Sequence, residues 1–296
     1  MQTLLRREFA VSATVGSLAG LGGGLVAAAV SGRADAALAV GFACAASVTL
    51  LLGRRWLRRV LLLRKPLEEA RRAVLEREVA FYRALDGGQR REFERNVQCF
   101  LAEHTITGPK GADVAEDVKV LVAASAAMLL FGREDLDLPR YVDVVIYPDR
   151  FDPESYDVSK RADVSGVVHW QGPVIFSERD LREAFAKARD GLHVGLHEFA
   201  HLLDLESGHF DGMPSGMPWA ATKPWMSIVH NEMRRIRAHR SVMREYGATN
   251  EPEFFAVATE AFFERPNEMR TKHAKLYEAL REFYGQDPAT RPGAKT

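Results

Sequence analysis

Two long apolar stretches near the N-terminus form the strongest hydrophobic pattern in the chain. Residues 9–32 contain no charged side chain, and residues 36–53 form a second uncharged run after a three-residue gap. At about 1.5 Å per residue, helices of these lengths cross or nearly cross a hydrocarbon core of about 30 Å. Because the gap is so short, the pattern predicts a transmembrane helical hairpin.

Small residues recur within both apolar stretches. Gly16, Gly20 and Gly24 are spaced four residues apart, and Gly41 with Ala45 offers a similar face in the second stretch. Such spacing lets two helices approach closely in lipid. The alternative is that the glycines only make the segment less hydrophobic, and the sequence leaves both interpretations open.

Charged residues at the ends of the hairpin predict its orientation. Arg6 and Arg7 precede it, and six basic residues follow it between positions 54 and 65. Because basic flanks tend to stay in the cytoplasm, both termini and the remaining chain are expected on the cytoplasmic side of the inner membrane. A rival interpretation is a twin-arginine-like export signal with a cleavage site near residues 34–36.

Helical periodicity dominates the rest of the chain. Residues 66–84, 90–104 and 115–131 each carry apolar residues at helical spacing, and residues 271–284 repeat the pattern near the C-terminus. We expect the charged residues of these segments to lie on the solvent-exposed faces of the helices. We therefore expect a mainly helical domain after the hairpin.

Two segments between these helices favour strands. Residues 140–147 (RYVDVVIY) predict a buried strand, and residues 166–176 predict a strand, a kink and a second strand. The fold class is therefore expected to be α+β, with a small sheet. The predicted organisation is a membrane hairpin with its basic flank at 1–65, a catalytic domain at 66–291 and a disordered tail at 292–296.

Composition narrows the function further. The 296 residues include 40 basic and 40 acidic side chains, so the formal net charge is zero. This balance gives no electrostatic reason to expect nucleic acid as a partner. The two cysteines, Cys44 and Cys99, lie in different kinds of segment. A disulfide framework is therefore not indicated, which is natural in a reducing compartment.

Residues 195–204 (GLHEFAHLLD) contain an H-E-x-x-H motif within an apolar segment. On a helix, His197 and His201 lie on one face and can direct ring nitrogens at a single point. Glu198 stands next to the first histidine, where it can take a proton from water beside a metal ion. The motif therefore predicts a zinc site with Glu198 as general base.

A catalytic zinc site needs a third protein ligand. His193 lies one turn before His197, but three successive turns span too far for a single ion, so we expect it either to support a ligand from outside the coordination shell or to have a structural role. The extended metzincin motif is absent, because position 204 is Asp and position 207 is Ser. A carboxylate from a later helix is the alternative.

Residues 246–263 (YGATNEPEFFAVATEAFF) form the best candidate for that helix. Asn250 is placed to cap it, and Glu253 and Glu260 are seven residues apart on one face. Glu253 is also explained by the preference for acidic residues in a first turn. Glu260 lies among Phe and Ala residues, where an unpaired carboxylate is costly, so we expect it to hydrogen-bond a ligand histidine.

The two motifs in this order resemble those of the Mlc titration factor A family of zinc peptidases. Over the same motifs the chain is also similar to the catalytic domain of anthrax lethal factor. The resemblance extends to VIYP at 145–148, WQGP at 170–173 and FYGQDP at 283–288. It covers roughly residues 85–291. The family archetype lacks the two N-terminal apolar stretches.

The resemblance implies a zincin-like, gluzincin-type fold and assigns residues to roles. It implies His197, His201 and Glu253 as zinc ligands and Glu198 as general base. It implies Tyr246 as the hydroxyl that stabilises the oxyanion, a role suited to a phenol. Asp204 is expected either to orient a ligand or to cap the loop that begins at Ser207 and Gly208.

The sequence thus predicts a zinc-dependent peptidase, and the resemblance suggests an aminopeptidase-like preference. The competing hypothesis is a membrane-tethered regulatory module that binds a transcriptional repressor similar to Mlc, with hydrolysis incidental. Binding should survive the loss of Glu198, whereas hydrolysis should not. The expected partners are a peptide or protein substrate and the lipid bilayer.

Overall fold

The computed structural model describes residues 2–133, 135–139, 142–151, 166–168, 172–187, 189–205 and 211–291. Four sequence predictions involve segments outside these ranges: the loop that begins at Ser207, residues 140 and 141 of the predicted strand, residues 169–171 of the predicted strand, kink and strand, and the tail at 292–296. The chain divides into two compact units, Met1–Pro66 and Leu67–Thr296. Each unit is described separately.

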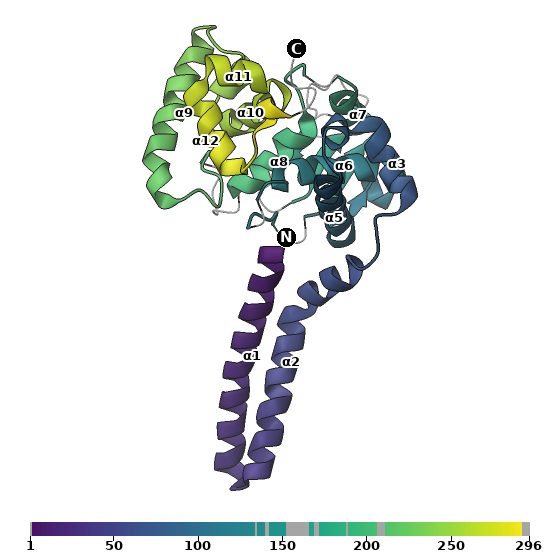
Figure 1. Ribbon diagram of the computed structural model, residues 1–296, viewed down its shortest axis with the longest axis vertical. Coiled ribbons are helices and arrows are strands. Elements are labelled where there is room, and N and C mark those ends of the chain that lie inside the picture. The colour runs from purple at the N-terminus through teal and green to yellow at the C-terminus, as the bar shows by residue number, and fades with distance from the viewer. Residues whose placement is uncertain are drawn as a thin grey trace. The chain divides into compact units, whose positions relative to one another are not determined.

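The first unit is a pair of helices, α1 (Gln2–Ser31) and α2 (Ala34–Leu62), which lie side by side (Figure 1). Both are long and apolar enough to cross a membrane, a test that a signal sequence also passes. The two helices approach closely at their glycines. A Cβ on Gly20 would lie 2.7 Å from Ala45 Cβ, and one on Gly41 would lie 2.9 Å from the carbonyl oxygen of Gly20. The predicted small-residue face is therefore confirmed.

The second unit is mostly helical, as predicted (Figure 1). Its α-helices are α3 (Glu69–Glu78), α4 (Ala80–Arg83), α5 (Gly87–Glu103), α6 (Glu116–Leu130), α7 (Glu178–Ala186), α8 (Val194–Leu205), α9 (Thr222–Arg237), α10 (Glu251–Glu264), α11 (Pro266–Lys272) and α12 (Ala274–Tyr284). Four short 3-10 helices are also described: η1 (Pro109–Gly111), η2 (Trp219–Ala221), η3 (Glu245–Ala248) and η4 (Pro288–Thr290).

The sheet contains four described strands in the order β1-β2-β4-β3. They are β1 (Ile106–Thr107), β2 (Val144–Tyr147), β3 (Gly166–Val168) and β4 (Val174–Ser177). β2 is parallel to β1 and β4, whereas β3 is antiparallel to β4. β4 is buried along its whole length. The small sheet predicted by the sequence is therefore confirmed, and β3 forms one edge of its described part.

Helix α8 lies between α6 and α10 in the middle of the second unit, and it also contacts β3 (Figure 1). Leu196, Phe199 and Leu203 of α8 are completely buried in the hydrophobic core. Helix α6 is buried almost throughout, and α10 contributes Phe254, Phe255 and Phe262. The segment with the H-E-x-x-H motif is thus the central helix of this unit.

Two predicted helices are broken by tertiary contacts. The helix expected at 66–84 ends at Glu78 and restarts at Ala80, because Val79 adopts an extended conformation and is fully buried. The helix expected at 271–284 is divided at His273 into α11 and α12. The buried His273 ring lies 2.6 Å from Glu232 Oε2 and accepts the amide hydrogen of Val242. These contacts fix the position of His273 between α11 and α12, where helical periodicity alone predicts one continuous helix.

Close packing of α8 against α6 gives a prediction about stability. A Cβ on Gly195 would overlap Ser125 Oγ, so Gly195→Ala is expected to destabilise the protein by about 1–3 kcal/mol. The measurement is thermal unfolding. Combining Gly195→Ala with Ser125→Gly should recover part of the loss, because the second change removes the overlapping atoms. An unchanged melting temperature in Gly195→Ala would contradict the packing described here.

Candidate metal centre

The N-terminus of α8 is held by two buried polar contacts. His193 Nδ1 accepts the amide hydrogen of Leu196 at 3.2 Å, and the His193 amide donates to Glu260 Oε1 of α10 at 3.0 Å. The first contact satisfies an amide that an uncapped helix start leaves unpaired. The second fixes the position of α8 against α10. His193 therefore has a structural place at the start of the helix, which is one of the two roles that the spacing argument predicted.

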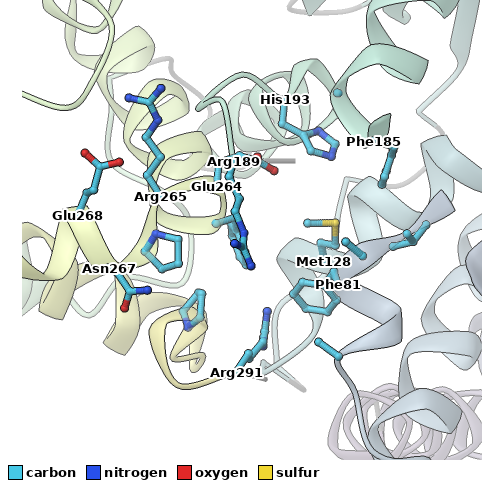
Figure 2. A pocket seen from close by; sticks show the side chains of 17 residues that line it. Phe81, Met128, Phe185, Arg189, His193, Glu264, Arg265, Asn267, Glu268 and Arg291 are labelled. Atoms are coloured by element: carbon cyan, nitrogen blue, oxygen red, sulfur yellow. The ribbon is translucent and has the colours of Figure 1, made fainter. Parts of the chain in front are cut away.

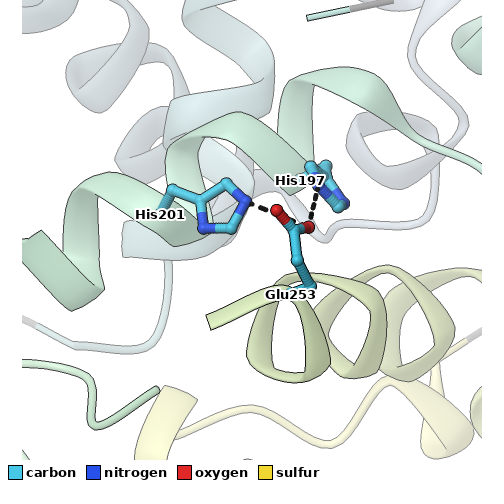
Figure 3. A group of neighbouring side chains, drawn as sticks. All are labelled: His197, His201 and Glu253. Atoms are coloured by element: carbon cyan, nitrogen blue, oxygen red, sulfur yellow. Dashed lines mark ion pairs between the residues drawn. The ribbon is translucent and has the colours of Figure 1, made fainter. Parts of the chain in front are cut away.

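His197, Glu198 and His201 follow on α8 and are all buried. The rings of the two histidines have their centroids 4.9 Å apart. Because four residues are only slightly more than one helical turn, both rings leave the helix on the side that faces α10. Figure 3 shows them on either side of the Glu253 carboxylate.

Glu253 reaches this point from the first turn of α10. The Asn250 side chain accepts the Glu253 amide hydrogen at 2.9 Å, which confirms the predicted helix cap. Glu253 Oε2 lies 3.2 Å from His197 Nε2 and 3.5 Å from His201 Nε2 (Figure 3). The structure thus brings together the three residues that the sequence named as ligands.

One ligand atom from each of the three residues lies within 4.8 Å of the other two, and the two separations from Glu253 Oε2 suit a small divalent ion. Tetrahedral ligands each about 2 Å from one zinc ion lie roughly 3.3 Å apart. The two measured separations, 3.2 and 3.5 Å, are close to this value. Glu253 Oε2 is buried and makes no hydrogen bond within the part of the chain that the structure describes. Two imidazoles and one carboxylate are also a suitable donor set for zinc.

Negative charge surrounds His197. Glu253 Oε2 faces its Nε2, and Glu260 Oε2 lies 3.6 Å from its Nδ1. Burial opposes protonation of the ring, but these two carboxylates raise the pKa of His197 to about 10. For Glu253, burial also acts against charge, yet the two histidines hold its pKa well below the usual value. The cluster is therefore an environment that stabilises positive charge.

Glu260 contacts several groups at once. It accepts the His193 amide hydrogen, faces His197 and forms an ion pair with Arg244. Burial disfavours its charge, but His197 and Arg244 lower the pKa of Glu260 below the usual range. The sequence predicted a hydrogen bond from Glu260 to a ligand histidine; Glu260 Oε2 lies 3.6 Å from His197 Nδ1, and this nitrogen makes no hydrogen bond among the described residues. Glu260 also joins α8, α10 and the segment before η3.

Glu198 lies on α8 beside strand β3. A Cβ on Gly166 would come within 2.5 Å of Glu198 Oε1, so a larger residue at this position would displace the Glu198 side chain. Glu198 is 4% exposed, and burial raises its pKa. The edge of the sheet and the carboxylate are therefore in direct contact.

Tyr246 lies in η3 on the more open side of the cluster. Its ring centroid is 6.0 Å from that of His197, and the residue is 49% exposed. Burial of its other half and the nearby Glu253 charge raise the pKa of Tyr246 to about 12. The phenol is therefore neutral at physiological pH and can donate a hydrogen bond next to the cluster.

Asp204 is completely buried near the end of α8. Its Oδ2 accepts the amide hydrogen of Gly212 at 3.0 Å, and the Gly212 carbonyl accepts from Trp225 Nε1 at 2.7 Å. Burial raises the pKa of Asp204 to about 6. Of the two roles considered for Asp204, this contact is of the loop-fixing kind, although residues 206–210 lie outside the described ranges.

Two residues of this centre were not identified from the sequence. Arg244 carries the charge that balances Glu260, and Gly166 makes the space that Glu198 occupies. Arg244 lies two residues before Tyr246, so its proximity to that motif was an available signal. Gly166 begins a predicted strand, and nothing in the sequence connects it with Glu198.

Comparison with known proteins places the chain among relatives of a metallo-peptidase family. The family described as glucose-regulated metallo-peptidase M90 matches residues 53–285. An uncharacterized protein of Synechocystis is 31% identical over 240 residues, which cover 77% of this chain and 87% of that protein. Mlc titration factor A of Cronobacter sakazakii is 28% identical over 226 residues, 70% of this chain and 83% of the relative. The same factor of Escherichia fergusonii is 29% identical over 209 residues, 65% of this chain and 77% of the relative.

Proposed function

Because the chain belongs to the glucose-regulated metallo-peptidase M90 family, we propose that it is a zinc-dependent peptidase. The observation that carries the proposal is the convergence of His197 Nε2, His201 Nε2 and Glu253 Oε2 from two packed helices. These three residues would be the ligands of a gluzincin-type site, leaving a fourth position open for water or substrate. The second unit, with its four-stranded sheet beside the motif helix, would then have a zincin-like fold.

A bound zinc ion would act as a Lewis acid and lower the pKa of water at the open position. The Glu198 carboxylate, buried against Gly166, would take the proton from that water and deliver it to the leaving amine. The Tyr246 hydroxyl, which is half-exposed beside His197, would donate a hydrogen bond to the developing oxyanion. Glu260 would accept from His197 Nδ1 and so hold that ring with Nε2 toward the ion.

Strand β3 is the proposed binding edge for the substrate. It forms one edge of the described sheet, and its first residue, Gly166, contacts Glu198. An extended peptide that pairs with this edge by main-chain hydrogen bonds would bring a scissile carbonyl past the proposed base. We propose short peptides with a free amino terminus as the first substrates to examine.

The two apolar N-terminal helices would anchor the enzyme in the membrane. The basic residues that follow them favour a cytoplasmic location for the second unit. Export by a twin-arginine-like signal is the alternative, and membrane fractionation with protease accessibility distinguishes the two. Protection of the second unit in intact spheroplasts supports the cytoplasmic location.

A second candidate function is suggested by the name of several relatives, Mlc titration factor A. The chain would then bind a repressor similar to Mlc while attached to the membrane, and hydrolysis would be incidental. The two functions are distinguished by Glu198→Gln, which should leave repressor binding intact. Binding is measured by pull-down of the purified repressor with each form of the full chain.

Chelation tests the proposed enzyme directly. Treatment of the purified full-length protein with 1,10-phenanthroline should remove hydrolysis of amino-terminally free p-nitroanilide peptides, and added zinc should restore it. The control is 1,7-phenanthroline, which has the same ring system but chelates metals poorly. Hydrolysis that persists after the metal content has fallen to zero would contradict a metal-dependent mechanism.

A further inference from the structure

A cavity of about 320 Å³ lies beside the N-terminal end of α8, among residues of α4, α6, α7, α10 and α11 (Figure 2). This volume is at the lower end of the range for small-molecule sites. His193 contributes to its wall, but none of His197, His201 and Glu253 does. The cavity, named here the α8 pocket, is therefore a different site from the candidate metal centre.

One buried hydrogen-bond donor in the pocket has no acceptor. His193 Nδ1 accepts the Leu196 amide hydrogen, so the proton of the neutral ring is on Nε2. Burial lowers the pKa of His193 to about 4, which keeps the ring neutral. The residue is 2% exposed, and Nε2 has no hydrogen-bond partner within the described ranges. A buried donor of this kind is costly unless a ligand atom accepts from it.

The pocket also contains a cation, Arg291, on which the charge of Asp287 acts but with which no carboxylate of the described residues forms an ion pair. The Arg291 guanidinium lies 3.8 Å from the centre of the Phe81 ring, and it donates to the Gln286 side-chain oxygen at 2.5 Å. Among the described residues it forms no ion pair, and burial lowers the pKa of Arg291 to about 10. In Figure 2 both Arg291 and Arg189 point toward the middle of the pocket. The basic groups thus face the space that a ligand would fill.

Among the remaining polar groups of the wall, Glu264 interacts electrostatically with Arg189, but at neutral pH this carboxylate is only partly ionised. The buried Glu264 carboxylate already accepts the amide hydrogen of Arg189, and burial raises its pKa to about 7. Arg265 turns its guanidinium toward the carbonyl oxygens of Asp190 and Val242. Glu268 is exposed at the edge of the pocket.

Apolar side chains cover the rest of the wall: Val79, Phe81, Met128, Phe185 and Phe263. Phe81 presents one face to the Arg291 guanidinium and belongs to a cluster of aromatic residues that includes Phe93 and Phe131. A ligand that fits this wall needs an apolar part as well as a charged one.

We propose that the α8 pocket binds a small organic anion, in which a carboxylate or phosphate group contacts Arg291, Arg189 and His193 Nε2, and an apolar body lies against Phe81 and Phe263. Guanidinium groups suit both kinds of anion, because their donors match two oxygens at once. The proposal concerns binding alone and does not depend on the peptidase activity.

Titration calorimetry tests this with the full chain in a neutral maltoside detergent. The probes are phenyl phosphate and benzoate, and the comparisons are inorganic phosphate and benzyl alcohol, which carry only one of the two required features. At least one aromatic anion should bind at least 10-fold more tightly than either comparison compound. Whichever of the two binds more tightly identifies the preferred anionic group. Equal affinity for inorganic phosphate and phenyl phosphate would overturn the role of the apolar wall.

Substitutions locate the bound probe. Arg291→Gln should weaken binding of the aromatic anion at least 10-fold, and Arg240→Gln, which changes an exposed arginine elsewhere, should not. Ala80→Trp provides a second test, because Ala80 is exposed at the pocket and a large ring there would obstruct entry. Thermal unfolding establishes that each variant is folded. Binding that survives both pocket substitutions but disappears when the metal is removed would overturn the proposal.

Discussion

Glu198→Gln is expected to lower kcat for peptide hydrolysis by about 10²–10⁴-fold while zinc remains bound, because the amide cannot take a proton from water. Glu198 is not among the three converging ligand atoms, and Gln has nearly the same shape. The space beside Gly166 should therefore still be filled. The measurements are kcat on a peptide substrate and the zinc content of the same sample.

The matched control is Glu282→Gln, which removes an exposed carboxylate from α12 without approaching the centre. It should hydrolyse the peptide at the rate of the unchanged protein. A Glu198→Gln protein with full activity would eliminate the assigned base. A variant that has lost its zinc would instead indicate that Glu198 supports the metal site, and the assay would then not report on proton transfer.

The fold could be predicted from the sequence where local pattern decides the structure. Two uncharged stretches separated by three residues became α1 and α2, and the glycines at every fourth position became their contact face. The prediction was wrong where a tertiary contact overrides periodicity. Nothing near His273 in the sequence shows that its ring contacts Glu232 of α9, and this contact accompanies the break between α11 and α12.

The candidate site likewise contains residues that local spacing predicts and residues that depend on tertiary packing. His197, Glu198 and His201 are recognisable because one helical turn determines their mutual positions. Glu253 is 52 residues from His201 by their sequence numbers. Spacing alone could not select it over other acidic residues, and the family resemblance supplied the choice. Gly166 could not be found at all, because its role depends on β3 packing against α8.

Glu260 of α10 contacts both the start of α8 and the segment before η3, so the positions of these three parts of the site depend on one another. A single carboxylate accepts the His193 amide hydrogen at the start of α8 and forms an ion pair with Arg244 just before η3. It also faces His197. Because an isolated buried carboxylate is costly, these contacts must form together when the core closes. The packing of the core therefore fixes the position of the His197 ring through the same carboxylate that joins α8, α10 and Arg244.

Glu253→Gln is expected to weaken zinc binding by on the order of 100-fold or more, because it removes the negative charge and one of the two oxygens of a proposed ligand and leaves only a neutral amide oxygen. The Asn250 cap should persist, since it uses the backbone amide of residue 253. The control is Glu251→Gln in the same helical turn, which removes the same charge from the helix N-terminus but contacts His230 at the surface. Competition with a calibrated zinc chelator measures the affinities, and thermal unfolding of the metal-free proteins checks their folding. Equal zinc affinity in Glu253→Gln and Glu251→Gln would mean that the carboxylate between the two histidines does not hold the ion.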